Sequence, residues 1–321
     1  LAGKPASAPP AALRADATTP LVAAVLPATP DGLYGPGKTL EFEVRLSEPV
    51  TFSAPPALEL ATDAGPRLLT TTTLPPADLL VFSYTVVAGD LAAPLAVSRF
   101  LAGDAEDVGG NPLATALPTG APLAGLSIDG VPPGAFSLEG QAIALGTLPL
   151  AVPWSASAGA VRYELRLGAT CTNPLRTATV SDTSYVLEAV PDGSYVACVR
   201  ALDAADNATD ATNDGAPVTI DATPPLVTSV QASTSGLLAA GASVTFDVQL
   251  SEPLATGATL ELELTLDAGA TRRVPLSGAG SALSGPYTVV AGDNASPVET
   301  FRVVATAARD PAGNALIESI G

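Results

Sequence analysis

The chain has 321 residues, a net charge of −18, two lysines and no histidine. Nucleic acids and anionic lipids need clustered Lys and Arg, and most nucleophile activation and zinc ligation needs histidine. The remaining carboxylate chemistry, glycoside hydrolysis, is disfavoured because aromatic residues make up only 4% of the chain. We therefore expect no enzyme, no nucleic-acid partner and, without a run of about 18 apolar residues, no membrane span.

An internal repeat organises the chain. Tyr84-Thr-Val-Val-Ala-Gly-Asp90 recurs letter for letter as Tyr287–Asp293, and Leu46-Ser-Glu-Pro49 recurs as Leu250–Pro253. The turn that ends in Gly109-Gly-Asn111 returns in the same order. Each copy has the size of a whole domain, which indicates a modular array rather than a solenoid.

Three linker-like stretches, each an Asp followed by Thr or Pro residues, begin at Asp16, Asp129 and Asp221. Such clusters end one strand and start another extended segment. The predicted divisions are an N-terminal extension (1–15), a first repeat (16–129), a middle segment (130–221) and a last repeat (222–321).

The segments read as short strands. Glu41–Leu46 alternates, with Phe42, Val44 and Leu46 on one face, and Leu260–Leu266 alternates in the same way. Turn signals separate such stretches, and none keeps a helical period. The predicted fold class is all-β, with three tandem β-sandwiches in an elongated array.

The two repeats resemble the Ig-like repeats of large bacterial surface adhesins. The shared features are Gly32–Gly37, the strand that ends in Leu-Ser-Glu-Pro, the Tyr-Thr-Val-Val-Ala-Gly-Asp stretch and the Asp-x-x-Gly-Asn turn at Asp107–Asn111 and Asp310–Asn314. The resemblance covers about two thirds of the chain, and the order of the motifs is more specific than any one of them.

The middle segment resembles a fibronectin type III module instead. Ala151–Trp154, Val161–Leu167 and Pro191–Ala201 match its strands B, C and F. The resemblance implies that Trp154 lies in the core and that Tyr195 forms the tyrosine corner. The alternation places Val161, like Tyr163, Leu165 and Leu167, on the inner face.

Both cysteines lie in this segment. Cys171 follows strand C, and Cys198 lies on strand F, out of phase with Tyr195 and so on the outer face of the sheet. We expect a Cys171–Cys198 disulfide, and two free thiols are the alternative. A disulfide implies an oxidising compartment, so the expected location is secreted, extracellular or at the cell surface.

Acidic residues gather in the linkers and in the turns at the sandwich ends. Calcium takes hard oxygen ligands, and in the adhesin repeats that the chain resembles, aspartates at the joints often bind calcium and stiffen the rod. The alternative is plain turn chemistry, in which Asx side chains bond their own backbone. The candidate calcium ligands are Asp16, Asp104, Asp107, Asn111, Asp129, Asp203, Asp206, Asp221, Asp310 and Asn314.

The function predicted from these features is structural: a spacer or subunit of an extracellular bacterial surface fibre. One alternative is an adhesive module that recognises a glycan or protein, although the long loops Leu101–Gly120 and Asp203–Gly215 carry no aromatic residue and no Arg. The other alternative is an accessory part of a larger secreted enzyme. The expected partners are other copies of the chain or neighbouring domains of a longer chain.

Counting strands suggests a further hypothesis. The last repeat has few residues after Asn314, while Ala8–Ala15 precedes Asp16 as a closing strand would. An incomplete sandwich exposes an edge that can pair with another chain, so donor-strand assembly into a head-to-tail filament is one interpretation. The alternatives are a longer tandem chain cut at two points, or Ala315–Ile320 acting as a short closing strand.

Overall fold

A computed structural model describes residues 15–71, 76–120, 123–139, 148–295, 301–306 and 308–320. Nearly all of its regular structure is β-strand, and the one exception is a 3-10 turn at Asp267–Gly269. The all-β prediction is therefore confirmed. Across the described ranges, no helix has the length and apolar character needed to cross a membrane. The hypothetical donor segment falls almost wholly outside these ranges.

The chain divides into two compact units. The first comprises 1–134, 157–161 and 201–209, and the second comprises 135–156, 162–200 and 210–321. The loop after residue 201 belongs to the first unit because Asn207 and Thr209 donate hydrogen bonds to the carbonyls of Asp129 and Pro133. The division into three domains therefore stays a prediction.

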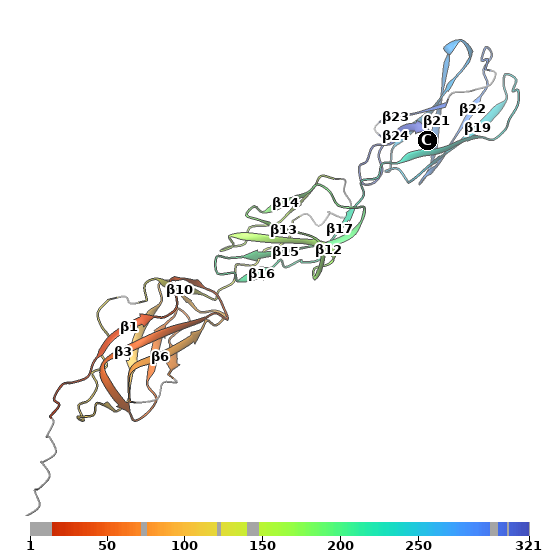
Figure 1. Ribbon diagram of the computed structural model, residues 1–321. Coiled ribbons are helices and arrows are strands. Elements are labelled where there is room, and N and C mark those ends of the chain that lie inside the picture. Colours follow the sequence, from red (N-terminus) through yellow and green to blue (C-terminus); the bar gives the residue numbers. More distant parts are fainter. Residues whose placement is uncertain are drawn as a thin grey trace, which may run out of the picture. The chain divides into compact units, whose positions relative to one another are not determined.

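The first repeat is a sandwich within the first unit (Figure 1). One sheet has the order β1-β3-β6 with β9 on β3, a second has the order β5-β4-β8, and β2-β10-β7 form a third. The strands are β1 (Val22–Pro27), β2 (Gly32–Tyr34), β3 (Thr39–Phe52), β4 (Ala57–Ala61), β5 (Arg67–Thr70), β6 (Ala77–Thr85), β7 (Leu91–Ala92), β8 (Ala96–Leu101), β9 (Ala105–Glu106) and β10 (Leu126–Asp129).

Alternation along β3 builds the core of the first repeat. Phe42 and Val44 are fully buried, as predicted, and Phe42 lies opposite Phe82 of β6. Phe82 in turn meets Phe100 of β8 edge to face, with ring centroids 6.3 Å apart. One face of each strand thus packs into a single apolar layer.

In the middle segment the main sheet has the order β13-β12-β15-β16, with β17 also on β15, and β11 pairs β14. Trp154 is buried against Tyr163, and Tyr195 donates its hydroxyl to the Pro191 carbonyl at 2.8 Å, which is a tyrosine corner. The strands are β11 (Leu150–Pro153), β12 (Arg162–Thr170), β13 (Asn173–Val180), β14 (Ser184–Leu187), β15 (Gly193–Leu202), β16 (Ala208–Asp210) and β17 (Ala216–Ile220).

Two details of the middle segment differ from the prediction. Val161 is 52% exposed, because it precedes β12 and does not share the inward face of that strand. Cys198 is fully buried rather than on an open outer face. The loop that follows β16 packs against β15 at this point. The Asp214 carboxylate accepts a hydrogen bond from the Val199 amide at 2.7 Å, and the Gly215 amide donates to the Ala197 carbonyl.

The last repeat lies within the second unit and forms one continuous sheet, ordered β23-β20-β21-β22-β19-β18-β24. The sheet is continuous because β21 pairs β20 along its first half and β22 along its second. Phe246, Val248, Leu262 and Leu264 alternate into its core as predicted. The strands are β18 (Leu226–Ala232), β19 (Ser243–Leu250), β20 (Thr259–Thr265), β21 (Thr271–Ala279), β22 (Ala282–Thr288), β23 (Phe301–Thr306) and β24 (Ile317–Ile320).

The predicted disulfide between Cys171 and Cys198 is confirmed, with the two Cα atoms 5.6 Å apart and a sequence separation of 27. It ties the turn between β12 and β13 to β15. We predict that replacing both cysteines by alanine lowers the free energy of unfolding by about 3.5 kcal/mol, the chain-entropy value for a loop of this length.

Urea unfolding followed by Trp154 fluorescence measures this loss, because Trp154 is the only tryptophan and lies in the core of the same segment. Adding a reductant to the wild-type protein should give a similar shift. An unchanged unfolding midpoint in the double variant would contradict the stabilising role.

Candidate functional site at the linkers

Three five-residue loops share one conformation, although only two of them lie in the repeats. They span 107–111, 203–207 and 310–314, and we call them clasp loops. In each, the amide of the first residue donates to the carbonyl of the last at 3.1 Å. The fourth residue of each adopts a positive φ, with Gly in the repeats and Asp206 (φ 66°) in the middle segment. Asp tolerates this left-handed conformation better than most residues.

The middle clasp loop shows what these residues do. Asp203 Oδ1 accepts the Asn207 backbone amide at 2.9 Å, and Asp203 Oδ2 accepts the Asn207 side-chain amide at 2.8 Å. The same Asn207 Nδ2 also donates to the backbone carbonyl of Asp129 at 2.9 Å. One buried asparagine therefore ties the loop to the linker residue at which the preceding strand ends.

The other two clasp loops repeat these contacts. In the last repeat, Asn314 Nδ2 donates to Asp310 Oδ2 at 2.8 Å and to the Asp221 carbonyl at 2.9 Å. In the first repeat, Asn111 Nδ2 donates to Asp107 Oδ2 at 2.8 Å and, more weakly, to the Asp16 carbonyl at 3.4 Å. All three predicted linker aspartates are thus held through their carbonyls.

The side chains of the linker aspartates form turns. Asp16 accepts the Thr18 amide at 3.0 Å, Asp129 accepts the Val131 amide at 2.9 Å, and Asp221 accepts the Thr223 amide at 3.2 Å. Each carboxylate bonds the backbone two residues on, as an Asx turn does. This is the turn chemistry that the sequence offered as the alternative to metal binding.

Two of the three linkers also carry a cluster of acids. One carboxylate oxygen each from Asp16, Glu48 and Asp107 lie within 4.8 Å of one another, and so do oxygens from Asp221, Glu252 and Asp310. Sequence reasoning missed both glutamates. The signal was present, since each is the Glu of the repeated Leu-Ser-Glu-Pro motif.

The remaining predicted ligands do not join these clusters. Asp104 and Asp206 belong to no three-acid group among the described residues, and neither do Asp129 and Asp203. The amide nitrogens of Asn111 and Asn314 are hydrogen-bond donors and cannot ligate a cation. Calcium binding therefore stays a prediction, and the two acid clusters are the places where oxygen ligands converge.

A serine makes the same backbone contact in all three segments, and it shows which residue of the middle segment corresponds to Glu48 and Glu252. Ser47 and Ser251 accept the backbone amides of Leu21 and Leu226 at 3.0 and 2.9 Å. Ser155 accepts the Ser137 amide in the same manner at 3.0 Å. The residue after this serine is Glu in both repeats but Ala156 in the middle segment, so the middle linker is a natural control for the acid clusters.

The clusters carry an electrostatic cost. Burial, followed by repulsion from Asp16 and Asp107, raises the pKa of Glu48 above its ordinary 4.5. Burial, followed by repulsion from Asp221 and Asp310, likewise raises the pKa of Glu252. In contrast, the Asn111 amide holds the pKa of Asp107 below its ordinary value. The glutamates therefore carry most of the electrostatic cost of each cluster, and a bound cation would offset the repulsion between the carboxylates.

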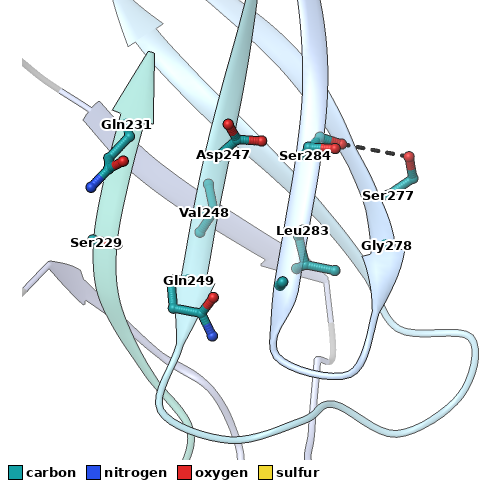
Figure 2. A pocket seen from close by; sticks show the side chains of 10 residues that line it. Ser229, Gln231, Asp247, Val248, Gln249, Ser277, Gly278, Leu283 and Ser284 are labelled. Carbon is teal, nitrogen blue, oxygen red and sulfur yellow. Dashed lines mark hydrogen bonds between the residues drawn. The ribbon is translucent and has the colours of Figure 1, made fainter. Parts of the chain in front are cut away.

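Surface depressions give weak support to a recognition role. One, of about 400 Å³, lies on the last repeat and is lined mainly by Ser, Gln and Gly, with Leu283 its largest apolar side chain (Figure 2). It holds no aromatic residue and no Arg. A second, of about 370 Å³, includes Tyr185 and Arg176, but that guanidinium is already bonded to the Ala189 carbonyl.

Comparisons with known proteins add little to these contacts. No protein-family model matches the chain, and no curated protein does. Among solved structures, it is similar to the fibronectin(III)-like modules of Clostridium thermocellum CbhA, with 16% identity and a TM-score of 0.27. That match covers 61% of this chain and 92% of the other. A TM-score this low carries no argument about function.

We predict that the Glu48→Gln/Glu252→Gln double variant melts at a higher temperature than the wild type at neutral pH in a chelator. The folded-state pKa of each glutamate is raised, so protonation favours the fold, and this stability is lost as the pH rises through the folded value. The advantage of the variant should therefore shrink as the pH falls toward 4.5, the unfolded value. Calorimetry with and without chelator measures both effects.

Calcium should reverse that order. A calcium ion bound at one site would stabilise the wild type by about 2.7 kcal/mol when the free ion is 100 times its Kd, and the double variant should gain less. Ala156→Gln is the matched control, because it places the same side chain at the equivalent position where there is no cluster. If calcium leaves the wild-type melting temperature unchanged, the clusters are ordinary turn acids.

Proposed function

We propose that this chain is a stiff, non-catalytic spacer segment of an extracellular surface protein. The observation that carries the proposal is the clasp, which occurs with the same atoms at all three linkers. A spacer needs its modules fixed to their linkers, and the clasp supplies this through one side-chain amide shared between a loop carboxylate and a linker carbonyl. A ligand-binding or catalytic protein has no need of the same contact at every linker.

The linker between the first repeat and the middle segment shows how completely a linker is held. Asn207 binds the Asp129 carbonyl, and the Asp129 side chain bonds the Val131 amide. Thr209 donates to the Pro133 carbonyl at 2.6 Å. The prolines remove further backbone freedom, because each fixes its own φ and restricts the residue before it. We therefore expect this linker to be stiff.

The linker at Asp221 is held in an equivalent way by different partners. Asp192 accepts both the Ala222 amide, at 2.8 Å, and the Thr223 hydroxyl. Both hydrogen bonds hold the pKa of Asp192 below its ordinary value, so this carboxylate is charged at neutral pH. On this proposal, calcium at the acid clusters adds a second restraint to the linkers at Asp16 and Asp221.

The disulfide supports the extracellular part of the proposal. Disulfides persist in oxidising compartments and are rare in the reducing cytosol. The Cys171–Cys198 bond joins the two cysteines of the chain. The strongly acidic composition also fits a surface protein that must stay soluble and avoid self-association.

Spin-label distance measurements test the spacer function. Labels at Leu68→Cys and Leu175→Cys lie on either side of the linker at Asp129, and labels at Leu175→Cys and Ala279→Cys lie on either side of the linker at Asp221; all three sites are exposed. We predict a narrow, single-peaked distance distribution for both pairs. Asn207→Ala should broaden only the first pair and Asn314→Ala only the second, so each variant is the control for the other. Broad distributions in the wild type would contradict a stiff spacer.

A further inference from the structure

The repeated stretch Tyr84–Asp90 contains the loop against which the closing strand of the first repeat ends. β10 pairs β2 in parallel and β7 in antiparallel, which buries Leu126 and Ile128 completely. Directly after β10, the Gly130 amide donates to the Asp90 carbonyl at 2.6 Å, and the Gly89 amide donates to the Gly130 carbonyl at 2.8 Å. We call residues 86–90 the receiving loop.

Only glycine fits at position 130. A Cβ placed there would lie 2.4 Å from the Val87 carbonyl oxygen and 3.1 Å from the Asp90 carbonyl oxygen. Both obstacles are backbone atoms, and they belong to a loop that cannot easily shift. The receiving loop therefore recognises an extended strand of the form Leu-x-Ile-Asp-Gly, in which two alternate apolar residues enter the core and the glycine docks on the loop.

A buried ion pair holds the receiving loop in shape. Asp90 is fully buried and accepts hydrogen bonds from the Tyr84 hydroxyl and from the Arg67 guanidinium. These contacts hold the pKa of Asp90 below its ordinary value, since Arg67 stabilises its charge. Removal of either partner would leave a buried carboxylate poorly paired.

The last repeat contains the same loop, already formed. Tyr287 donates its hydroxyl to Asp293, and Arg272 lies 2.7 Å from the same carboxylate. The backbone pairing of the stretch is also repeated, since the Val289 amide donates to Ala242 as that of Val86 does to Lys38. Residues 289–293 therefore reproduce the receiving loop of the first repeat.

Among the residues that the structure describes, no strand pairs with this second receiving loop. No residue that the structure describes hydrogen-bonds to the Gly292 amide or to the Asp293 carbonyl, the groups that Gly130 engages in the first repeat. Side chains around the loop are correspondingly more open. Val289 is half-buried where Val86 is 2% exposed, and Leu237 is 97% exposed where its counterpart Leu33 is 43% exposed.

β24 does not occupy the position in the last repeat that corresponds to β10 in the first repeat. It runs parallel to β18, starting from the pair Leu226 and Ile317. The first repeat has the equivalent contact as a parallel bridge between Leu21 and Ala114, far along the chain from β10. The segment Ala315–Ile320, which the sequence suggested as a short closing strand, therefore occupies a different edge from the one that β10 covers.

We propose that the receiving loop of the last repeat, together with the exposed Leu237 side chain, is a docking site for an extended segment with the pattern Leu-x-Ile-Asp-Gly. The proposal rests on the spacer function and names the chemistry of the segment that the last repeat binds. Apolar side chains at the first and third positions would cover Val289 and Tyr287. The glycine would pair with the Gly292 amide and the Asp293 carbonyl.

The amino-terminal segment of a second copy does not have this chemistry. Its sequence Leu13-Arg-Ala-Asp16-Ala17 places alanine at the glycine position. Docked as Gly130 docks, its Cβ would meet the carbonyl of Val290, the counterpart of Val87. Asp16-Ala17-Thr18 instead matches Asp221-Ala222-Thr223, which leaves the middle segment. The occupant is therefore a glycine-bearing strand rather than residues 8–17 of another copy.

Peptide binding to the full-length chain tests this proposal. The probes are a labelled peptide of residues 121–133, the same peptide with Gly130→Ala, and a peptide of residues 6–18. Fluorescence anisotropy measures affinity, and hydrogen exchange compares residues 287–295 with the matched stretch 84–92, which its own strand already covers. We expect protection at 287–295 alone, and binding at least ~10-fold weaker for the alanine peptide.

Three outcomes would overturn the proposal. The first is no added protection at 287–295 with saturating 121–133 peptide. The second is equal affinity for the glycine and alanine peptides, which would remove the recognition of glycine. The third is tighter binding of the 6–18 peptide, which would instead support head-to-tail assembly of copies. Broad spin-label distance distributions would contradict the spacer function without affecting the peptide result.

Discussion

One asparagine side chain at each linker fixes the linker to the module that the chain then enters. Its amide nitrogen has two hydrogens, and the clasp loop uses one on its own aspartate and the other on a linker carbonyl. The bond to the carboxylate is charge-assisted, which makes it stronger than a neutral pair and fixes the direction of the second hydrogen. Aspartate at the same position would offer no donor and would repel Asp203. Glutamine would extend beyond the carbonyl.

The two repeated motifs bind consecutive residues of one linker. The clasp loop takes the Asp129 carbonyl, while the receiving loop takes the next residue, Gly130, through the Asp90 carbonyl. Consecutive linker residues are thus bound by different loops, and no free residue separates them. In the first repeat this gives three residues of the repeated stretch a defined role: Tyr84 donates to Asp90, Asp90 also accepts from Arg67, and the Gly89 amide donates to the Gly130 carbonyl.

The sequence predicted those features that depend on local pattern. Alternation placed Phe42 and Phe246 in the cores, and the strand phase paired Cys171 with Cys198. It could not show that Glu48 lies beside Asp16, because that contact depends on how β3 passes the linker just beyond its pairing with β1. It also missed the donor role of the asparagines. Asn207 and Asn314 donate to carbonyls 78 and 93 residues away, and local sequence spacing cannot indicate contacts over such separations.

Amide hydrogen exchange at the first interior linker tests the central claim most directly. If the Asn207 side chain immobilises the linker, Asn207→Ala should speed exchange of the Gly130 and Val131 amides by roughly 10-fold, the loss of about one good hydrogen bond. The Thr223 amide, in the linker held by Asn314, should exchange at its wild-type rate in the same sample. Unchanged exchange at Gly130 and Val131 would contradict the account, because the linker would then be held without the clasp.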